Sequence, residues 1–294
     1  MLNSISPKKI SVIGLGQMGK KIAEMFVQRD YDVTVWNRTE AKAKELTAVK
    51  IANRVEDALA QSTFSIICVY DNTAVMEILN DVKDSKVFAG KTIINFTTGS
   101  PEEVRKLESW LAGLSATYLN GAIQVAPDQM GLPDTTILMG GNREALTSCN
   151  EILDVLGGNI KFLGEQASAS PAMDMATLSW VYGSYVGLMY GVALCQSEGI
   201  NLKEYSTIIG EIAPGFLEFY KHEIDMIREG NFNITQSPLS ISIGASQRIA
   251  DTIKAIGSDT SFTDVIASLL LKAKDKGYEH EEVAALIKVI RGQS

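Results

Sequence analysis

The feature that most constrains this chain is a set of three closely spaced glycines near its N-terminus. Gly14, Gly16 and Gly19 follow an apolar run with β propensity and open a helical pattern. Such glycines permit a tight turn, a close approach of the backbone to a pyrophosphate, and close packing of helix on strand, while the helix N-terminus holds the phosphates. In this context the pattern predicts a dinucleotide-binding turn rather than a glycine-rich turn without a ligand. The predicted contacts are Gly14, Leu15, Gly16, Gln17, Met18 and Gly19.

Short β-rich runs alternate with helical stretches up to Gly164. Strands are expected at Lys9–Gly14, Tyr31–Trp36, Phe64–Tyr70, Lys91–Phe96, Thr117–Val125, Thr135–Gly140 and Ile160–Leu163. Helices are expected at Met18–Arg29, Glu40–Leu46, Val75–Leu79, Pro101–Leu114 and Arg143–Leu156. Alternating β and α units predict the α/β class, with a Rossmann-type, doubly wound and mainly parallel sheet that carries helices on both faces.

The second half of the chain reads as helical throughout. Ser168–Glu198 forms one helical pattern, about 45 Å long at 1.5 Å per residue. Further helices are expected at Glu218–Glu229, Leu239–Ile256, Thr263–Lys276 and Glu279–Arg291. We therefore expect a nucleotide-binding domain over residues 1–164, an inter-domain helix over 165–198, and an all-α substrate and dimerisation domain over 199–294.

The long helix contains an uncharged stretch of 23 residues, Met175–Ser197, which is long enough to cross a bilayer. The stretch carries three tyrosines and several hydroxyl side chains, and no basic cluster flanks it to set an orientation. We therefore expect a helix buried between domains or subunits rather than a membrane span. A short helical domain cannot cover it alone, so we expect an interlocked homodimer whose active sites lie between one chain's nucleotide domain and its partner's helical domain.

Composition excludes several classes of partner. With 27 basic and 35 acidic side chains the net charge is −8, so the chain has no electrostatic footprint for nucleic acid or for an anionic membrane. The three cysteines lie far apart, which excludes a disulfide framework and indicates a reducing, cytoplasmic compartment. His222 and His280 lack the spacing of metal ligands, so no metal is expected. Met1–Lys9 has no apolar stretch, so no secretion signal is expected.

The end of the second expected strand indicates the type of cofactor. Enzymes that prefer NADH place a carboxylate there for the ribose 2′-hydroxyl, whereas this chain has Asn37, Arg38 and Thr39. Arg38 can stack on adenine and pair bidentately with a 2′-phosphate, so the sequence predicts NADPH. Loops that leave the other parallel strands face the same crevice. Those loops contribute Val69, Tyr70, Asn95, Thr97 and Thr98.

A nicotinamide cofactor supplies the hydride, so the protein must supply the proton and the substrate pocket. Asp174 is the strongest candidate for that role. It is the one carboxylate on the long helix before Glu198, and its neighbours are alanines and methionines. Burial there would let it hold a proton near neutrality, or it would remain an anion that pairs with a cationic substrate. Tyr182 lies eight residues on, on a neighbouring helix face from which its hydroxyl would orient substrate. The alternatives are a first-turn helix carboxylate for Asp174 and a packed aromatic for Tyr182.

Several of these motifs together carry a resemblance to a known family. They are Gly14–Gly19, Trp36–Thr39, Asn95–Gly99, Gly121–Ile123, Met173–Gly183 and Gly187–Leu194. The chain resembles the imine reductases and reductive aminases, NADPH-dependent relatives of the β-hydroxyacid and 6-phosphogluconate dehydrogenases, over nearly its whole length. The resemblance implies reduction of C=N bonds in cyclic imines or iminium ions to amines, with some reductive amination.

The resemblance also implies roles for particular residues. The family has a catalytic Asp, sometimes a Tyr, where this chain has Asp174. A Tyr at the position of Tyr182 helps to hold the amine or imine. Ile123, Trp180 and Phe216 are the expected apolar walls of the substrate pocket, although Trp180 and Phe216 would equally suit a core.

Two other functions stay open at this point. A β-hydroxyacid dehydrogenase has the same architecture but carries Lys at the position of Asp174 and Asn at that of Leu178, with Ser-Gly-Gly at Ile123–Val125. A cationic Lys suits an alkoxide, whereas a carboxylate suits an iminium, so imine chemistry is favoured. The third interpretation is a cofactor-binding sensor without turnover, which leaves Asp174 without a purpose.

Two positions depart from the family pattern. Well-studied reductive aminases carry Asn at the position of Thr98, so efficient coupling of an amine with a ketone is not expected. Gln124 and the pair Asp128-Gln129, near the expected pocket, are also unusual for the family.

Overall fold

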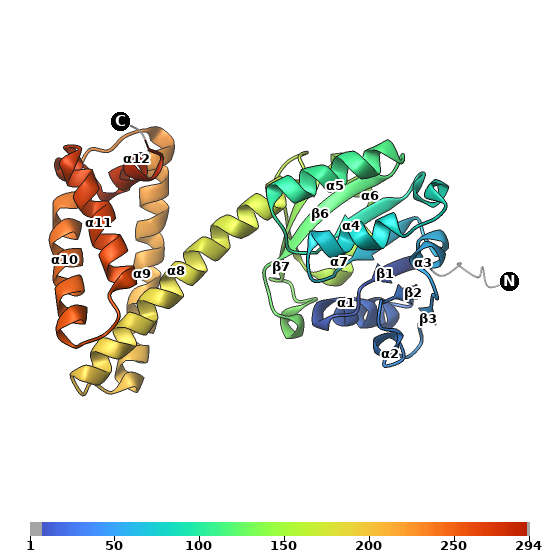
Figure 1. Ribbon diagram of the computed structural model, residues 1–294, viewed down its shortest axis with the longest axis horizontal. Helices are drawn as coiled ribbons and strands as arrows, with labels where there is room; N and C mark the ends of the chain where they lie inside the picture. The colour runs from blue at the N-terminus through green and yellow to red at the C-terminus, as the bar shows by residue number, and fades with distance from the viewer. Residues whose placement is uncertain (1–7, 293–294) are drawn as a thin grey trace. The chain divides into compact units, whose positions relative to one another are not determined.

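The computed structural model describes residues 8–292 and divides into two compact units, Met1–Ser179 and Trp180–Ser294 (Figure 1). The division falls inside helix α8 (Ala169–Ser197), so this helix contributes to both units. Most of Met1–Lys9, where no secretion signal is expected, lies outside the described residues.

The first unit is built on one eight-stranded sheet with the order β3-β2-β1-β4-β5-β6-β7-β8. The strands are β1 (Lys9–Ile13), β2 (Asp32–Trp36), β3 (Lys50–Ile51), β4 (Phe64–Ile67), β5 (Thr92–Asn95), β6 (Thr117–Ile123), β7 (Thr136–Gly141) and β8 (Asn159–Phe162). All neighbours pair in parallel except β6 and β7, which are antiparallel. The order of the first six strands is that of a dinucleotide-binding fold, which confirms the predicted class.

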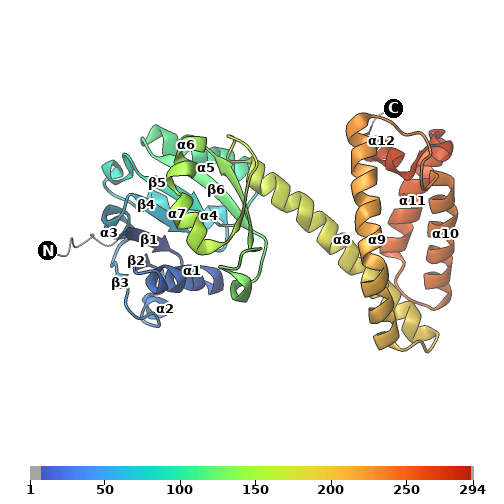
Figure 2. The same cartoon turned by 180° about the vertical axis from the view of Figure 1, so that it is seen from behind.

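Helices cover both faces of this sheet. They are α1 (Gln17–Gln28), α2 (Glu40–Ala43), α3 (Val55–Gln61), α4 (Asn72–Asn80), α5 (Pro101–Gly113), α6 (Arg143–Ser148) and α7 (Asn150–Leu156). One buried cluster joins α1 and α7 to the sheet, and a second joins α3, α4 and α5 to the opposite face. Side chains of β1 alternate between these clusters, with Val12 in the first and Ile13 in the second. Figures 1 and 2 view this unit from opposite sides.

Three details of the first unit differ from expectation. The sequence does not predict β3, because a two-residue, exposed edge strand leaves no apolar pattern. It does not predict the short helix α3 either. The single helix expected over residues 143–156 is wrong, since it is interrupted at Cys149. Just before the break, Thr147 and Ser148 donate their hydroxyls to carbonyls one turn earlier, a bond that weakens a helix.

The second unit is entirely helical, as predicted. It contains the end of α8 and then α9 (Leu202–Glu229), α10 (Leu239–Ala255), α11 (Ser261–Asp275) and α12 (Leu286–Ile290), with short 3-10 turns at Tyr278–His280 and Val283–Ala285 (Figure 2). Its main buried cluster is small, and the four fully enclosed apolar members come from α10, α11 and the second 3-10 turn. Much of the apolar surface of this unit is therefore left uncovered within the single chain.

Two expectations for the second unit are corrected. α9 begins at Leu202, not Glu218: Asn201 caps it through Lys203 N at 2.9 Å, and the helix continues through Pro214. The helix expected over residues 279–291 is broken by Glu282. This residue has an extended backbone and a buried side chain that binds the loop before α10 instead of continuing the helix.

α8 is the one helix, within residues 8–292, that is long and apolar enough to span a membrane by length and composition. Only 6% of its most apolar window is buried in this chain. Large apolar side chains therefore stand exposed along it, including Val181, Tyr185 and Met189. The expected burial of this helix is not provided by a single chain.

Candidate functional site

The glycine turn has the geometry that a bound dinucleotide needs. Gly14 has φ +94°, and a Cβ there would lie 2.3 Å from the carbonyl oxygen of Cys68. A Cβ on Gly19 would lie 2.0 Å from the carbonyl oxygen of Gly14, so strand and helix meet too closely for any side chain. No atom lies within 4 Å of the Cβ position of Gly16, which leaves its backbone open to a ligand.

The N-terminus of α1 offers free donors at the same place. Gly16 is its N-cap and supplies no side-chain cap, and the first turn contains no acidic residue. The first backbone N–H groups of a helix lack partners within the helix and favour a phosphate. Together with the open space at Gly16, these donors fit the pyrophosphate of a dinucleotide.

Asn37 ties the glycine turn to the end of β2. Its Oδ1 accepts a hydrogen bond from Leu15 N at 2.8 Å, and its Nδ2 donates to the carbonyl oxygen of Thr39 at 2.8 Å. Both ends of the carboxamide are therefore used within the protein. We assign Asn37 to shaping the cofactor loop, whereas Thr39 is the N-cap residue of α2.

Arg38 stands beside a separate cavity of about 510 Å³. Its guanidinium Nη2 lies 2.9 Å from Glu77 Oε2, and both side chains are more than half exposed. Arg54 and Lys83 line the same cavity and were not singled out in the sequence, because neither belongs to a motif. Arg54 is paired with Glu56 and Asp57, as Arg38 is with Glu77, so a phosphate that binds in this cavity would compete with these carboxylates.

The loops after β4 and β5 are bonded to each other. Val69 N donates to Thr97 Oγ1 at 3.1 Å, and Thr97 N donates to Asn95 Oδ1 at 2.9 Å. Asn95 is fully buried, so its side chain supports this loop from within the protein. Tyr70 is 92% exposed. The predicted contacts of Asn95 and Tyr70 with the cofactor stay predictions.

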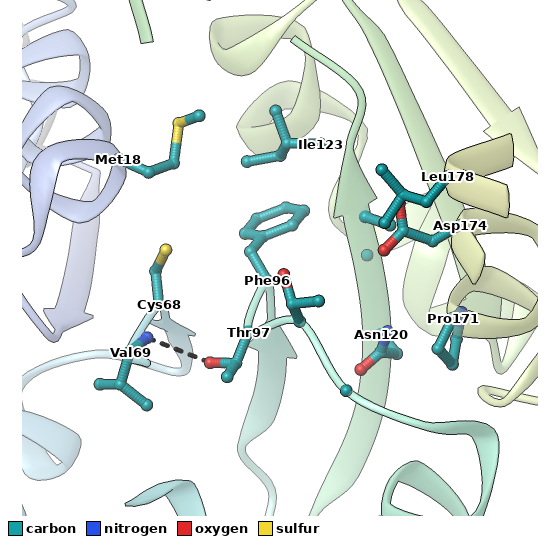
Figure 3. A pocket seen from close by; sticks show the side chains of 14 residues that line it. Met18, Cys68, Val69, Phe96, Thr97, Asn120, Ile123, Pro171, Asp174 and Leu178 are labelled. Carbon is teal, nitrogen blue, oxygen red and sulfur yellow. Dashed lines mark hydrogen bonds between the residues drawn. The ribbon is translucent and has the colours of Figure 1, made fainter. Parts of the chain in front are cut away.

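A cavity of about 340 Å³ lies where these loops meet α8 (Figure 3). Of the expected site residues, its lining includes Met18, Val69, Thr97, Thr98, Ile123 and Asp174. Lining residues not placed at the site in advance are Cys68, Phe96, Gly99, Asn120, Gly121, Ala122, Pro171 and Leu178. Figure 3 shows Pro171, Asp174 and Leu178 of α8 on one side of the cavity, with Met18, Cys68 and Val69 on the other.

Phe96 lies against the sheet at Gly121. A Cβ on Gly121 would approach Phe96 Cε1 to 2.3 Å, so the ring can rest on β6 only because this residue is glycine. Both residues belong to motifs of the sequence, Asn95–Gly99 and Gly121–Ile123, but the sequence does not show that the ring packs on the glycine.

Asp174 is the one charged side chain among the described residues that line this cavity. It is 8% exposed, and its Oδ1 accepts a hydrogen bond from Gln124 Nε2 at 2.7 Å. Cys68 also lines the cavity, and its thiol is titratable. Burial raises the pKa of its thiol to about 11, so Cys68 stays neutral at physiological pH.

The remaining expected site residues belong to the second unit. Trp180 and Phe216 line one apolar cavity of about 460 Å³, together with Tyr205 and Tyr220. Tyr182 lines neither cavity and is 64% exposed. The predicted roles of these residues toward substrate stay predictions. Within residues 8–292, no group of three or more His, Cys, Asp or Glu side chains is arranged to hold a metal ion.

Two family models together match nearly the whole chain. Residues 9–164 match the NAD-binding domain of 6-phosphogluconate dehydrogenase. Residues 166–292 match the C-terminal domain of NADPH-dependent reductive aminase-like proteins. The boundary between the two matches lies just before α8.

Individual relatives agree with these matches. An NADPH-dependent reductive aminase from Aspergillus oryzae is 28% identical over 293 residues, which is 97% of each chain. A solved reductive aminase from Aspergillus terreus, in complex with NADPH and ethyl levulinate, is 30% identical with a TM-score of 0.88 over 96% of this chain and 99% of that chain. An imine reductase from Pseudomonas sp. is 26% identical with a TM-score of 0.90 over 97% of this chain and 100% of that chain.

Proposed function

This chain belongs to the imine reductase and reductive aminase family, and we propose from that membership that it reduces the C=N bond of cyclic imines and iminium ions to amines. It is an NADPH-dependent oxidoreductase. The observation that carries the proposal is a single acid, Asp174, in the wall of an otherwise uncharged cavity beside the dinucleotide turn.

Different residues are proposed to bind the cofactor, enclose the substrate and act on its nitrogen. Bound NADPH supplies the hydride. The α1 N-terminus and the glycine turn hold the phosphates, while Met18, Val69, Thr97 and Thr98 enclose the reacting end. Asp174 acts on the substrate nitrogen: it either donates a proton to it or, as a carboxylate anion, stabilises a preformed iminium. The apolar lining from Phe96, Ile123 and Leu178 keeps water from competing for that nitrogen.

The charge of the acid favours imine reduction over oxidation of a hydroxy acid. A hydroxy-acid substrate brings its own carboxylate, and no described residue lining the cavity is a cation that would pair with it. An iminium carries the opposite charge and is attracted by Asp174. Reductive amination, in which the enzyme also brings amine and ketone together, is proposed as a secondary activity.

The exposed apolar side chains of the second unit support a homodimer. Trp180, Val181, Tyr185, Ile212 and Phe216 are each more than 40% exposed in the single chain. A patch of this kind marks a protein interface. We infer that a second copy of this chain covers it and completes the substrate pocket from its own helical unit. The three unpaired cysteines fit a cytoplasmic location.

The substitution Asp174→Asn tests the proposal. It preserves size but removes the charge and the titratable proton, and loss of a general acid typically lowers the rate by ~10²–10⁴-fold. We expect kcat with a five- or six-membered cyclic imine to fall at least ~100-fold, while the dissociation constant of NADPH stays unchanged. The assay follows the oxidation of NADPH in the presence of the imine. A parallel assay of NADP-dependent oxidation of small β-hydroxy acids tests the alternative activity.

An N-alkyl iminium substrate distinguishes the two roles of Asp174. Because its nitrogen needs no proton, it restores the rate of Asp174→Asn if the acid acts only as a donor. If Asp174 acts as an electrostatic anchor, the variant stays slow with this substrate too. Wild-type kcat of Asp174→Asn with both substrates would refute the proposed role of the acid.

A further inference from the structure

The carboxylate of Asp174 is held from one side by a side chain anchored to the sheet. Gln124 directly follows β6, and its backbone N–H donates to the carbonyl oxygen of Thr136 at 3.0 Å. From this fixed position its Nε2 donates to Asp174 Oδ1 at 2.7 Å. Within residues 8–292 no hydrogen bond reaches Asp174 Oδ2, so this oxygen remains available to a ligand.

Thr177 sets the orientation of the Gln124 amide. Its Oγ1 lies 3.0 Å from Gln124 Oε1 and 2.9 Å from the backbone carbonyl oxygen of Asp174. The hydroxyl has a single proton, which it donates to one of these two oxygens at a time, whereas an ionised carboxylate can only accept. An amide turned by 180° would place its oxygen against the carboxylate, so the orientation in which Nε2 faces Asp174 is favoured, and in that orientation Oε1 can accept the Thr177 proton.

We propose that Gln124 is a positioning residue that, together with Thr177, occupies Oδ1 of Asp174 and leaves Oδ2 as the atom that meets the substrate nitrogen. The inference rests on the proposed function. A hydrogen bond to a carboxylate is short, strong and directional, so it fixes both the side-chain rotamer and the oxygen that is free. The contacts span 50 and 53 residues of sequence, and they join the end of β6 to α8 within the first unit.

No other charged side chain lies among the described residues that line the cavity beside Asp174. Among the described residues that line the cavity, Asp174 is the one charged side chain, and Cys68 is the other side chain with a thiol or carboxyl proton. Gln124 and Thr177 are themselves uncharged. If a substitution at position 124 changes the pH dependence of kcat, the change therefore comes from Asp174 or from the new side chain at position 124.

The first test removes each hydrogen bond separately. We expect Gln124→Leu to lower kcat with a cyclic imine at least ~10-fold, with an unchanged KM for NADPH, because charge-assisted hydrogen bonds are the stronger class. Thr177→Val is expected to lower kcat ~3- to 10-fold, since the amide loses its orientation. Ser179→Ala is the matched control. Its hydroxyl also bonds a carbonyl one turn earlier on α8, at 2.8 Å, but contacts no site residue, so kcat is expected to stay at the wild-type value.

The second test uses Gln124→Glu, which keeps the size of the side chain. It places a second carboxylate at hydrogen-bond distance from Asp174, and two such groups cannot both ionise freely. The limb of the kcat profile that reports Asp174 is therefore expected to move to higher pH by about one unit or more. An unmoved profile would show that the side chain at position 124 does not face the carboxylate of Asp174, which would overturn the contact on which the inference rests.

The outcomes separate the inference from the proposed function. If Asp174→Asn loses activity but Gln124→Leu and Gln124→Glu keep the wild-type kcat and pH profile, the positioning role is overturned and the proposed function stands. If Asp174→Asn itself is fully active, both are overturned. A loss of kcat in Gln124→Leu that is matched by a lower Tm, with an unmoved profile in Gln124→Glu, assigns Gln124 a structural role and also overturns the inference.

Discussion

At the scale of single residues, Arg38 holds an ion pair that a bound 2′-phosphate would have to exchange. Its partner Glu77 lies on α4, 2.9 Å away, and the cavity beside them carries acidic side chains as well as basic ones. The guanidinium is thus held in place before the cofactor arrives, at the cost of a competing carboxylate. If Arg38 binds the 2′-phosphate, as the sequence predicts, the preference for NADPH over NADH depends on the balance between Glu77 and the phosphate.

The substitution Arg38→Glu tests this contact. A carboxylate repels the 2′-phosphate and can accept the 2′-hydroxyl of NADH. We expect the dissociation constant of NADPH to rise at least ~10-fold, because a charge-assisted contact is replaced by a repulsion, with little change or a fall for NADH. Titration of cofactor fluorescence measures both constants. An equal change for the two cofactors would show that Arg38 does not contact the 2′ position.

Glu77→Gln is the complementary variant. It releases Arg38 without changing the size of its partner, and an exposed ion pair is worth only about 0.2–1 kcal/mol. NADPH is therefore expected to bind about two- to fivefold more tightly. Weaker binding of NADPH to Glu77→Gln would instead mean that the ion pair prearranges Arg38 for the phosphate.

At the scale of elements, patterns within one segment were predictable and pairings between segments were not. The glycine turn, β1, α1 and the start of α5 at Pro101 follow from local patterns, and all four appear in the structure. The bond between Gln124 and Asp174 joins residues 50 positions apart, and only the antiparallel turn from β6 to β7 and the docking of α8 bring them together. The family resemblance marks Gln124 as unusual but does not indicate what it contacts.

Glu282 shows the same limit in the second unit. Its carboxylate is fully buried and accepts hydrogen bonds from the backbone N–H groups of Thr235, Gln236 and Ser237, which fastens the loop before α10. Burial acts to raise the pKa of Glu282, but these donors together outweigh it and lower the pKa. The pKa of neighbouring Glu223 is raised by burial and by the charge of Glu282.

These shifts predict how stability depends on pH. Because the folded-state pKa of Glu282 lies below its unfolded value, its contribution is complete above that unfolded value and is lost as the pH falls through the folded pKa. Glu223 has the opposite sign and opposes folding as the pH rises through its raised pKa. Glu282→Gln is expected to lower the free energy of unfolding at pH 7 by about 1.5–3 kcal/mol. Urea unfolding of the variant and the wild type measures this difference in the free energy of unfolding.

A matched substitution serves as the control for that measurement. Glu229→Gln also removes a carboxylate, but from an exposed side chain at the end of α9. Its effect is expected to stay within about 0.5 kcal/mol. Equal effects of the two substitutions would contradict the role of Glu282 as the buried fastening of the loop.

At the scale of the whole molecule, the uncovered apolar surface predicts self-association. Light scattering is expected to give twice the chain mass of 31.9 kDa. Met189→Glu places a charge on the exposed apolar stretch of α8 and is expected to shift the population toward monomer. It is also expected to lower kcat if, as proposed, a partner subunit completes the pocket. Lys221→Glu, a charge change at an exposed polar site on α9, is the control. A monodisperse wild-type monomer would remove the dimer proposal.

The strand order, with β1 between β2 and β4, has a consequence while the chain is still being made. The residues proposed to hold the dinucleotide all precede Gly99, whereas Asp174 is about 75 residues further along. A ribosome adds about 5–20 residues per second, and domains tend to fold from the N-terminus as they emerge. For roughly 4–15 s the nascent chain therefore contains every strand from β1 to β5 but not its acid. If these strands fold in that interval and bind NADPH, the cofactor would stabilise the emerging sheet as a ligand before Asp174 is present to take part in its oxidation.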